Sequence, residues 1–281
     1  MNAPAPGFTL GPNSYGKSGI RLVHVDRASA RHAIRDLTVH TALAGDLDAT
    51  HYSGDNTGVL PTDTQKNTVY AFARDGVGAI EAFAERLARH FVETVPAVAH
   101  ARVRIEEHPW TRIGDHSFAR GEGGELRTAE VRFDGAASVT AGVRDLLLLN
   151  TTDSEFSGFL VDGYTTLPET DDRILATAVT AAWDYAAAPA DPDEAFRAAR
   201  AALLDAFAGT YSLSLQQTLY AVGERILKTV PEAREVRLSL PNRHHYLLDL
   251  GPLGRDNPGV VFQAGDLPYG LIEGTVRREA P

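Results

Sequence analysis

The sequence predicts an α+β fold built from two tandem ββααββ repeats, in which antiparallel sheets are backed by helices. Patterns typical of strands and helices follow this order twice along the 281 residues. The two halves also share the tripeptide Thr-Val-Pro between the second helix and the next strand, at residues 94–96 and 229–231. Matching order and a shared junction indicate an internal duplication. We expect the repeats to span residues 1–136 and 137–281.

Four segments have the pattern of amphipathic helices. Apolar residues recur at three- and four-residue steps, with charged residues on the remaining surface. Asp191 and Ser212 are expected N-caps of the last two, and Thr62 or Asp63 is expected to cap the first. The predicted helices span residues 62–74, 78–93, 191–208 and 212–229.

Eight segments show alternating or β-branched patterns that favour strands. One of them, residues 174–183, is rich in alanine and would also suit a helix on intrinsic propensity. Two antiparallel four-stranded sheets leave exposed edges, and closure between repeats and between subunits into a barrel would cover them. The predicted strands span residues 21–25, 36–47, 101–105, 128–133, 143–150, 174–183, 235–240 and 245–250.

Composition narrows the classes of function. The formal net charge of −10 opposes binding to nucleic acid or to anionic membranes, so we expect neither partner. It also means that an anionic substrate would need a local cluster of Arg or Lys. The chain contains no cysteine, which excludes thiolate nucleophiles, disulfides and Cys-ligated zinc or iron–sulfur centres. Neither a signal-peptide pattern nor a long apolar run occurs, and we expect a cytoplasmic protein.

Two weaker patterns do not predict a site. His100, His108 and His116 recur at eight-residue steps, which is not a facing interval on a helix, and we expect surface histidines and no metal site. Gly76 and Gly78 lack the third glycine of a dinucleotide-binding loop.

Small polar residues interrupt the periodic patterns in four short segments, residues 15–17, 60–68, 156–173 and 239–244, and a fifth segment, residues 211–217, opens a helix. Together these segments resemble the urate oxidase (uricase) family. The matches extend from Tyr15 to Arg277 in the family's order and spacing. The resemblance implies the tunnelling fold, with two ββααββ repeats per chain and a homotetramer around a tunnel. The most specific matches are residues 62–68, 158–159, 164–167, 172–174 and 239–244.

The resemblance also implies how urate is held. Arg173 grips it with a planar fork of donors that suits adjacent oxygen and nitrogen acceptors. Gln216 binds the opposite edge, and Phe156 stacks on the flat heterocycle. Leu215 contributes its backbone N–H, and Leu167 an apolar wall.

A neighbouring subunit contributes the remaining groups in the family. Thr62, Asp63 through its backbone N–H, and Lys17 behind Thr62 come from that subunit. The resemblance implies that Lys17 and Thr62 form a proton relay with His244 of the other subunit, and that Asn242 with Thr62 holds dioxygen and then water. Deprotonated urate reduces dioxygen directly, so the resemblance implies no flavin, metal or other cofactor. The products are 5-hydroxyisourate and hydrogen peroxide.

Three positions depart from the family pattern. Pro61 replaces a small residue, Leu215 a common Val, and Ser157 an aromatic residue. These differences concern the fit of the substrate. The reaction does not depend on them.

Taken singly, each candidate has a structural explanation. Thr62 and Asp63 suit a helix N-cap, and Arg173 suits an ion pair with a neighbouring aspartate. Asn242 after a proline suits a turn between strands. The others are equally ordinary alone: Lys17 as a solvated turn charge, Gln216 as an exposed helix residue, Phe156 as a core residue, and His244 and His245 on opposite sheet faces.

Two other classes of function are alternatives. A pterin or purine lyase or hydrolase of the same fold typically binds its heterocycle through a Glu and often uses zinc, whereas Arg173 and Gln216 take the binding role here. A catalytically silent purine-binding protein would be favoured if Lys17, Thr62 or His244 were missing, and all three are present.

Overall fold

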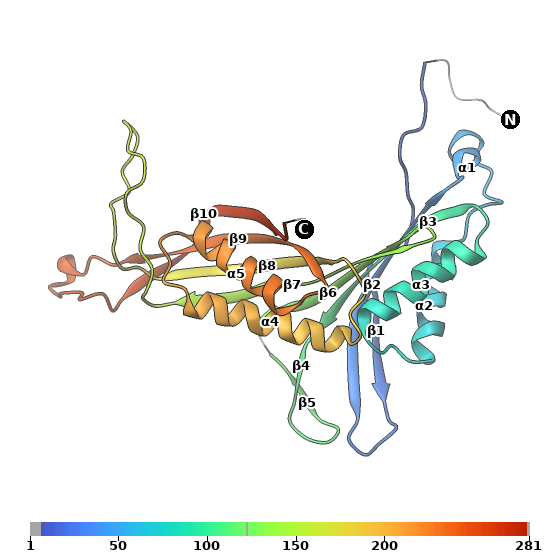
Figure 1. Cartoon of the computed structure of the whole chain (residues 1–281), viewed down its shortest axis with the longest axis horizontal. Coiled ribbons are helices and arrows are strands. Elements are labelled where there is room, and N and C mark those ends of the chain that lie inside the picture. Colours follow the sequence, from blue (N-terminus) through green and yellow to red (C-terminus); the bar gives the residue numbers. More distant parts are fainter. Residues whose placement is uncertain (1–6, 122, 280–281) are drawn as a thin grey trace. The chain divides into compact units, whose positions relative to one another are not determined.

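A computed structural model describes residues 7–121 and 123–279. It contains antiparallel sheet backed by helices, which confirms the predicted α+β class (Figure 1). The chain divides into two compact units. Unit 1 comprises Met1–Glu122, Leu126–Gly142 and Ala188–Asp193, and unit 2 comprises Gly123–Glu125, Val143–Ala187 and Glu194–Pro281. No helix in the described ranges is both long and apolar enough to span a membrane.

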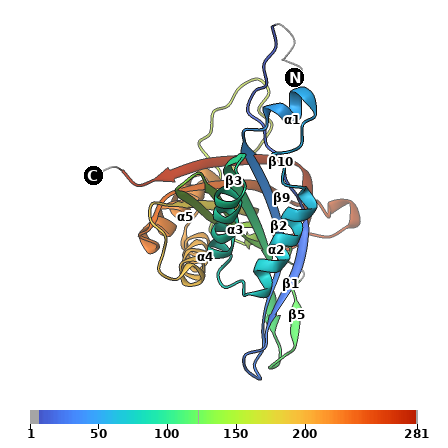
Figure 2. The same ribbon diagram turned by 90° about the vertical axis from the view of Figure 1, so that its right-hand side faces the viewer.

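Unit 1 is an antiparallel sheet with helices on one face. Its strands follow the order β1-β2-β3-β6-β7, and helices α2 and α3 lie along them (Figure 2). Helix α3 buries Phe83, Leu87 and Phe91 against β3 and β6, because the apolar stripe of an amphipathic helix faces the core. The elements are β1 (Ile20–Asp26), β2 (Ala33–Gly45), α1 (Asp48–Ser53), α2 (Thr62–Arg74), α3 (Ile80–Thr94), β3 (Val98–His108), β6 (Leu126–Phe133), the first residues of β7 (Ala137–Asn150), and a separate hairpin of β4 (Trp110–Arg112) and β5 (Phe118–Arg120).

Unit 2 repeats the pattern with strand order β7-β8-β9-β10. Helix α5 lies close against β9 and β10. A Cβ on Gly223 of this helix would come within 2.5 Å of the Val276 side chain, and one on Gly274 of β10 within 2.9 Å of Leu219. Glycine at both positions therefore permits the close approach. The elements are the rest of β7, β8 (Leu175–Tyr185), α4 (Pro192–Gly209), α5 (Leu215–Thr229), β9 (Ala233–Leu247), the 3₁₀ turn Gly251–Leu253 and β10 (Phe262–Arg277).

All four predicted helices are present, but two of the predicted caps are wrong. Helix α2 begins at Thr62 after Pro61, and no side chain caps it. Helix α5 is capped by Ser214, whose hydroxyl accepts a hydrogen bond from the Gln217 backbone N–H. Ser212 is fully buried instead, since its hydroxyl binds Thr218 and the Ser214 carbonyl.

The alanine-rich segment is strand β8, as predicted, whereas the last two predicted strands need correction. They are one strand, β9, which continues through Pro241 to Leu247. In the pairing with β8, Ser239 lies opposite Thr180 and Asn242 opposite Thr177. The two residues between them, which include Pro241, are not paired with β8, because proline has no N–H to donate. The final strand of unit 2 is β10, which the sequence pattern did not predict. Its glycines and its register shift interrupt the alternation of apolar and polar residues. The short elements α1, β4 and β5 were not predicted.

Candidate active site

Lys17 lies in a short extended segment that runs along β2 of unit 1. The backbones of Tyr15 and Leu43 exchange two hydrogen bonds of 3.0 and 2.7 Å, and the Thr41 N–H donates to the Lys17 carbonyl at 2.9 Å. A Cβ on Gly16 would lie 1.8 Å from the Thr41 carbonyl oxygen, so only glycine allows this contact. The position of Lys17 is thus set by the sheet.

Thr62 starts helix α2, and three hydrogen bonds, one of them fully buried, hold this helix start near Lys17. The Leu60 N–H donates to the Tyr15 hydroxyl at 2.9 Å, and burial raises the pKa of that hydroxyl. Gln65 is fully buried and accepts a 2.7 Å bond from the Thr41 hydroxyl. The same hydroxyl accepts from the Lys17 N–H at 3.2 Å. The sequence analysis did not predict that Thr41 and Gln65 connect Lys17 to helix α2. The only signal was the position of Gln65 within the segment 62–68 that matches the family.

Asp63 turns its carboxylate toward its own helix. The carboxylate pairs with Lys66 and accepts a 3.1 Å bond from the Asn67 amide. The hydrogen bond from Lys66 is the main reason that the pKa of Asp63 is lowered, and the charge of Lys17 adds a smaller effect. The first intrahelical bond of α2 runs from Gln65 N–H to Pro61, so the N–H groups before it are available to a ligand.

In unit 2, Arg173 and Phe156 lie together. The guanidinium carbon of Arg173 is 5.3 Å from the centroid of the Phe156 ring, and that ring stacks on Phe159 at 4.9 Å. Phe156 is fixed by two backbone hydrogen bonds with Thr170, of 2.8 and 3.1 Å. The half-buried guanidinium therefore lies against an aromatic face, as cations often do in proteins.

Arg173 has no acidic partner among the residues that the structure describes. The predicted alternative of an ion pair with Asp171 or Asp172 is wrong, and Asp172 instead accepts a 2.9 Å bond from the Thr152 hydroxyl. Burial lowers the pKa of Arg173, with no charged group opposing it. A partly buried cation without a counter-charge is suited to an anionic ligand.

Leu215 and Gln216 are the first two residues of α5. The Leu215 side chain is buried and that of Gln216 is exposed. The first intrahelical bond joins Thr218 N–H to the Ser214 carbonyl, and the Gln217 N–H donates to the Ser214 hydroxyl, so the N–H groups of Leu215 and Gln216 are available to a ligand. This helix start is tied to Arg173, since Ser154 forms a parallel bridge with Ser212 and its carbonyl accepts from the Arg173 N–H at 2.9 Å.

Leu167, Asn242 and His244 occupy other elements of unit 2. Leu167 is 58% exposed, on the loop that extends beyond the ends of β7 and β8 (Figure 1). Asn242 lies within β9, opposite Thr177 of β8 and Gly270 of β10, so the alternative of a turn at this residue is wrong. His244 lies opposite Gly265, and its ring stacks on Tyr246 at 5.7 Å.

The predicted residues thus form two groups. Lys17, Thr62 and Asp63 belong to unit 1, and we call these three the relay half-site after their predicted role. Seven predicted residues belong to unit 2, and we call them the urate half-site after their predicted ligand: Phe156, Leu167, Arg173, Leu215, Gln216, Asn242 and His244.

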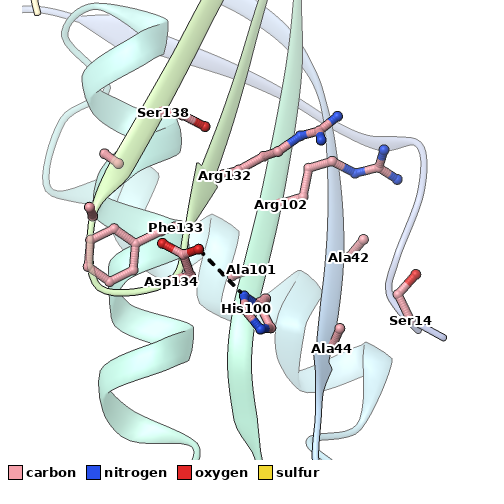
Figure 3. A pocket seen from close by; sticks show the side chains of 12 residues that line it. Ser14, Ala42, Ala44, His100, Ala101, Arg102, Arg132, Phe133, Asp134 and Ser138 are labelled. Carbon is pink, nitrogen blue, oxygen red and sulfur yellow. Dashed lines mark ion pairs between the residues drawn. The ribbon is translucent and has the colours of Figure 1, made fainter. Parts of the chain in front are cut away.

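A hollow of about 570 Å³ on the sheet of unit 1 lies outside both half-sites. Arg102 and Arg132 project over it from facing positions on β3 and β6, and His100 pairs with Asp134 at 3.8 Å (Figure 3). None of the predicted site residues lines this hollow. Within the described ranges, no three His, Asp or Glu side chains are grouped closely enough to hold a metal ion.

The fold and the group of residues in unit 2 combine an aromatic ring, a guanidinium and a helix N-terminus, as in the class of proteins suited to hold a flat anionic ligand. Comparison with known proteins gives the family. The sequence model described as "Uricase" matches residues 13–137 and 139–273. The chain belongs to the uricase family.

Individual relatives align with this chain over nearly its whole length. A uricase of Arthrobacter globiformis is 50% identical over 96% of this chain and 90% of its own length. A uricase of Dictyostelium discoideum is 37% identical over 96% of this chain and 98% of its own. The crystal structure of the Arthrobacter globiformis uricase superposes with a TM-score of 0.94 at 49% identity, over 98% of this chain and 96% of that one. A Bacillus sp. TB-90 urate oxidase shares the fold, with a TM-score of 0.80 at 22% identity over 95% and 100% of the two chains.

Proposed function

We propose that this chain binds urate at the urate half-site of one subunit, beside the relay half-site of a neighbouring subunit, and oxidises it there with dioxygen. Membership of the uricase family makes the chain a urate oxidase, an oxidoreductase of purine catabolism. The observation that best supports the binding mode is Arg173, a half-buried guanidinium over the Phe156 ring with no carboxylate partner in the described ranges. A planar anion satisfies both its charge and the aromatic surface.

The residue types of the urate half-site suit the two edges and the face of urate. Arg173 donates to one edge, where an oxygen and a nitrogen lie side by side. Gln216 offers one donor and one acceptor to the opposite edge. The Leu215 N–H adds a donor at the helix start, where the helix dipole favours an anion. Phe156 stacks on the ring, and Leu167 covers an apolar side.

The reaction joins one urate, one dioxygen and one water to give 5-hydroxyisourate and hydrogen peroxide. Dioxygen takes two electrons from urate and leaves as peroxide, and water supplies the hydroxyl that adds to the ring. Lys17, Thr62 and His244 pass protons between substrate, oxidant and water. Asn242 and Thr62 hold dioxygen and then water by hydrogen bonds. We propose that no flavin, metal or other cofactor takes part, because the urate dianion is itself the reductant.

The two half-sites meet between subunits of a homotetramer. Strands β1 and β10 are the outer strands of their units, and pairing such edges between subunits closes the sheets into a barrel. The tandem repeats proposed from the sequence, residues 1–136 and 137–281, supply one half-site each. The cytoplasmic location stays a prediction from the sequence.

The activity is tested with purified protein treated with a chelator and dialysed. Urate absorbance, oxygen uptake and peroxide are followed together. One peroxide formed for each dioxygen and each urate consumed, with a rate insensitive to the chelator, is the expected result. Turnover that requires an added metal would refute the cofactor-free proposal. Tight binding of a pterin without urate turnover would favour a different enzyme of the same fold.

The shared site is tested by mixing two inactive variants. Thr62→Ala damages the relay half-site and Arg173→Ala the urate half-site, and the variants are unfolded, mixed in equal amounts and refolded together. If each site combines two chains, random assembly leaves about a quarter of the sites intact, because each half is intact in about half of the chains. If both halves come from one chain, no site is intact and no activity returns.

A second mixture is the matched control. Lys17→Ala and Thr62→Ala both damage the relay half-site, which one chain supplies as a whole. Mixed oligomers of these two variants contain no intact relay half-site, so activity is expected to stay at the level of the separate variants. Recovery in this mixture would show that Lys17 and Thr62 come from different chains.

A further inference from the structure

Ser154 is a buried hydroxyl in direct contact with Arg173. It is 0% exposed, and its Oγ accepts a hydrogen bond from the Arg173 Nε at 3.3 Å. Its carbonyl oxygen accepts the Arg173 backbone N–H at 2.9 Å. Ser154 therefore binds both the backbone and the side chain of Arg173.

These two bonds restrict the guanidinium. An arginine side chain carries about 2 kcal/mol of rotamer entropy when free, and a planar fork binds well only when its plane and direction match the ligand. The bond at Nε sets the roll of the plane, and the Phe156 ring at 5.3 Å supports one face. The terminal Nη groups stay available as donors, because no carboxylate of the described residues pairs with them.

Ser154 is itself held by the backbone on both sides. The Glu155 N–H donates to the Ser212 carbonyl at 2.8 Å, and the Ser212 N–H donates to the Asp153 carbonyl at 2.9 Å. This parallel bridge joins Ser154 to the segment that leads into helix α5. The hydroxyl that accepts from Arg173 therefore lies on a backbone held to the segment that precedes helix α5.

We propose that Ser154 is a positioning residue for urate binding, whose hydroxyl orients the Arg173 guanidinium before the substrate arrives. The inference rests on the proposed role of Arg173 in gripping urate. Pre-orientation strengthens binding because the ordering cost is met during folding and not on binding.

The test is a double-mutant cycle on the purified oligomer, with KM for urate and kcat measured at saturating dioxygen. Ser154→Ala is expected to raise KM by about tenfold, the size of one hydrogen bond to a charged group, and to change kcat by less than about twofold. Lysine has no Nε–H for the hydroxyl to accept. In the Arg173→Lys background the same change is therefore expected to alter KM by less than about twofold.

A matched control separates this role from a loss of folding. Ser212→Ala removes an equally buried hydroxyl from the other side of the bridge, but that hydroxyl binds Thr218 and not Arg173. Its effect on KM is expected to be the same in both backgrounds. If Ser154→Ala folds poorly, Ser154→Cys fills the same space with a weak acceptor and serves in its place.

The outcomes are distinct. A rise in KM that is equally large in the wild-type and the Arg173→Lys backgrounds would overturn the role of Ser154 alone. So would the absence of any rise in a Ser154→Ala enzyme that remains active. A wild-type protein that does not turn over urate would overturn the proposed function instead.

Discussion

Arg127 is the centre of a buried ion network, and its removal should destabilise the protein strongly. Its side chain is 8% exposed and donates to both carboxylate oxygens of Glu81, at 2.8 and 3.1 Å. It also pairs with Asp193 and, at 3.4 Å, with Glu107. Arg35 is the second cation, and it binds Glu107 and Asp193. Three carboxylates thus share two guanidinium groups.

The change Arg127→Met leaves three carboxylates with one arginine, and Glu81, 4% exposed, loses both of its bonds to Arg127. Breaking a buried pair in this way costs about 3–5 kcal/mol, because a buried charge is left without compensation. At about 2–4 °C per kcal/mol for a chain of this size class, the apparent Tm at neutral pH should fall by roughly 6–20 °C. Scanning calorimetry at a fixed protein concentration measures it.

The pH dependence provides a second check. Burial already raises the pKa of Glu81, and Arg127 opposes that rise. Without Arg127 the pKa of Glu81 rises further, so the folded variant binds a proton that the unfolded chain releases at the same pH. Its stability therefore increases as pH falls from neutral toward the usual carboxylate range. The gap between variant and wild type should be smaller near pH 5 than near pH 7.5.

A matched control uses a more exposed pair. Arg200 binds Glu125 through two bonds of 2.6 and 2.8 Å, but the arginine side chain is 35% exposed. Arg200→Met should cost no more than about 1 kcal/mol. An Arg127 variant that is no less stable than the Arg200 variant, or whose deficit grows on acidification, would refute the reasoning.

Three other substitutions test the site. Thr62→Ala should lower kcat by about 100-fold or more, with much less effect on urate binding, because the proposed role of Thr62 is proton transfer. Stopped-flow kinetics measure the rate and equilibrium titration measures urate binding; equal losses in rate and in affinity would contradict this role. Arg173→Lys should raise KM for urate by about tenfold or more because a single ammonium cannot replace a planar fork, and an unchanged KM in steady-state assays would argue against the clamp. Gly16→Ala should lower both kcat and Tm, since a Cβ there meets the Thr41 carbonyl at 1.8 Å, and a fully active, equally stable variant would show that the Lys17 segment need not contact β2.

Much of the fold could be predicted because it depends on local pattern. Helix α2 begins and ends at the predicted residues 62 and 74, and α3 and α4 lie within two residues of prediction. The alanine-rich segment is a strand because alternate residues such as Val179 and Trp183 are fully buried, which outweighs the helix propensity of alanine. The periodicity of apolar residues determined these elements.

The errors occur where a local signal competes with a distant partner. A proline usually ends a strand, yet β9 continues through Pro241 because β10 pairs with β9 on both sides of this residue. Ser212 and Ser214 are equally good caps by composition, and the choice between them depends on Thr218, which takes the hydroxyl of Ser212 into the core. A sequence pattern does not contain these contacts.

For the candidate site, the residues proposed to carry the chemistry, and the ligand they suit, were predicted from the sequence through its resemblance to the uricase family. The surroundings of those residues follow from the folded structure alone. It gave Arg173 a serine and an aromatic ring in place of an aspartate, and it tied Lys17 to the start of α2 through Thr41 and Gln65. The physical reason is that hydrogen-bond partners and burial depend on which segments meet in space, and residues such as 15 and 60, or 154 and 212, meet only after the chain has folded.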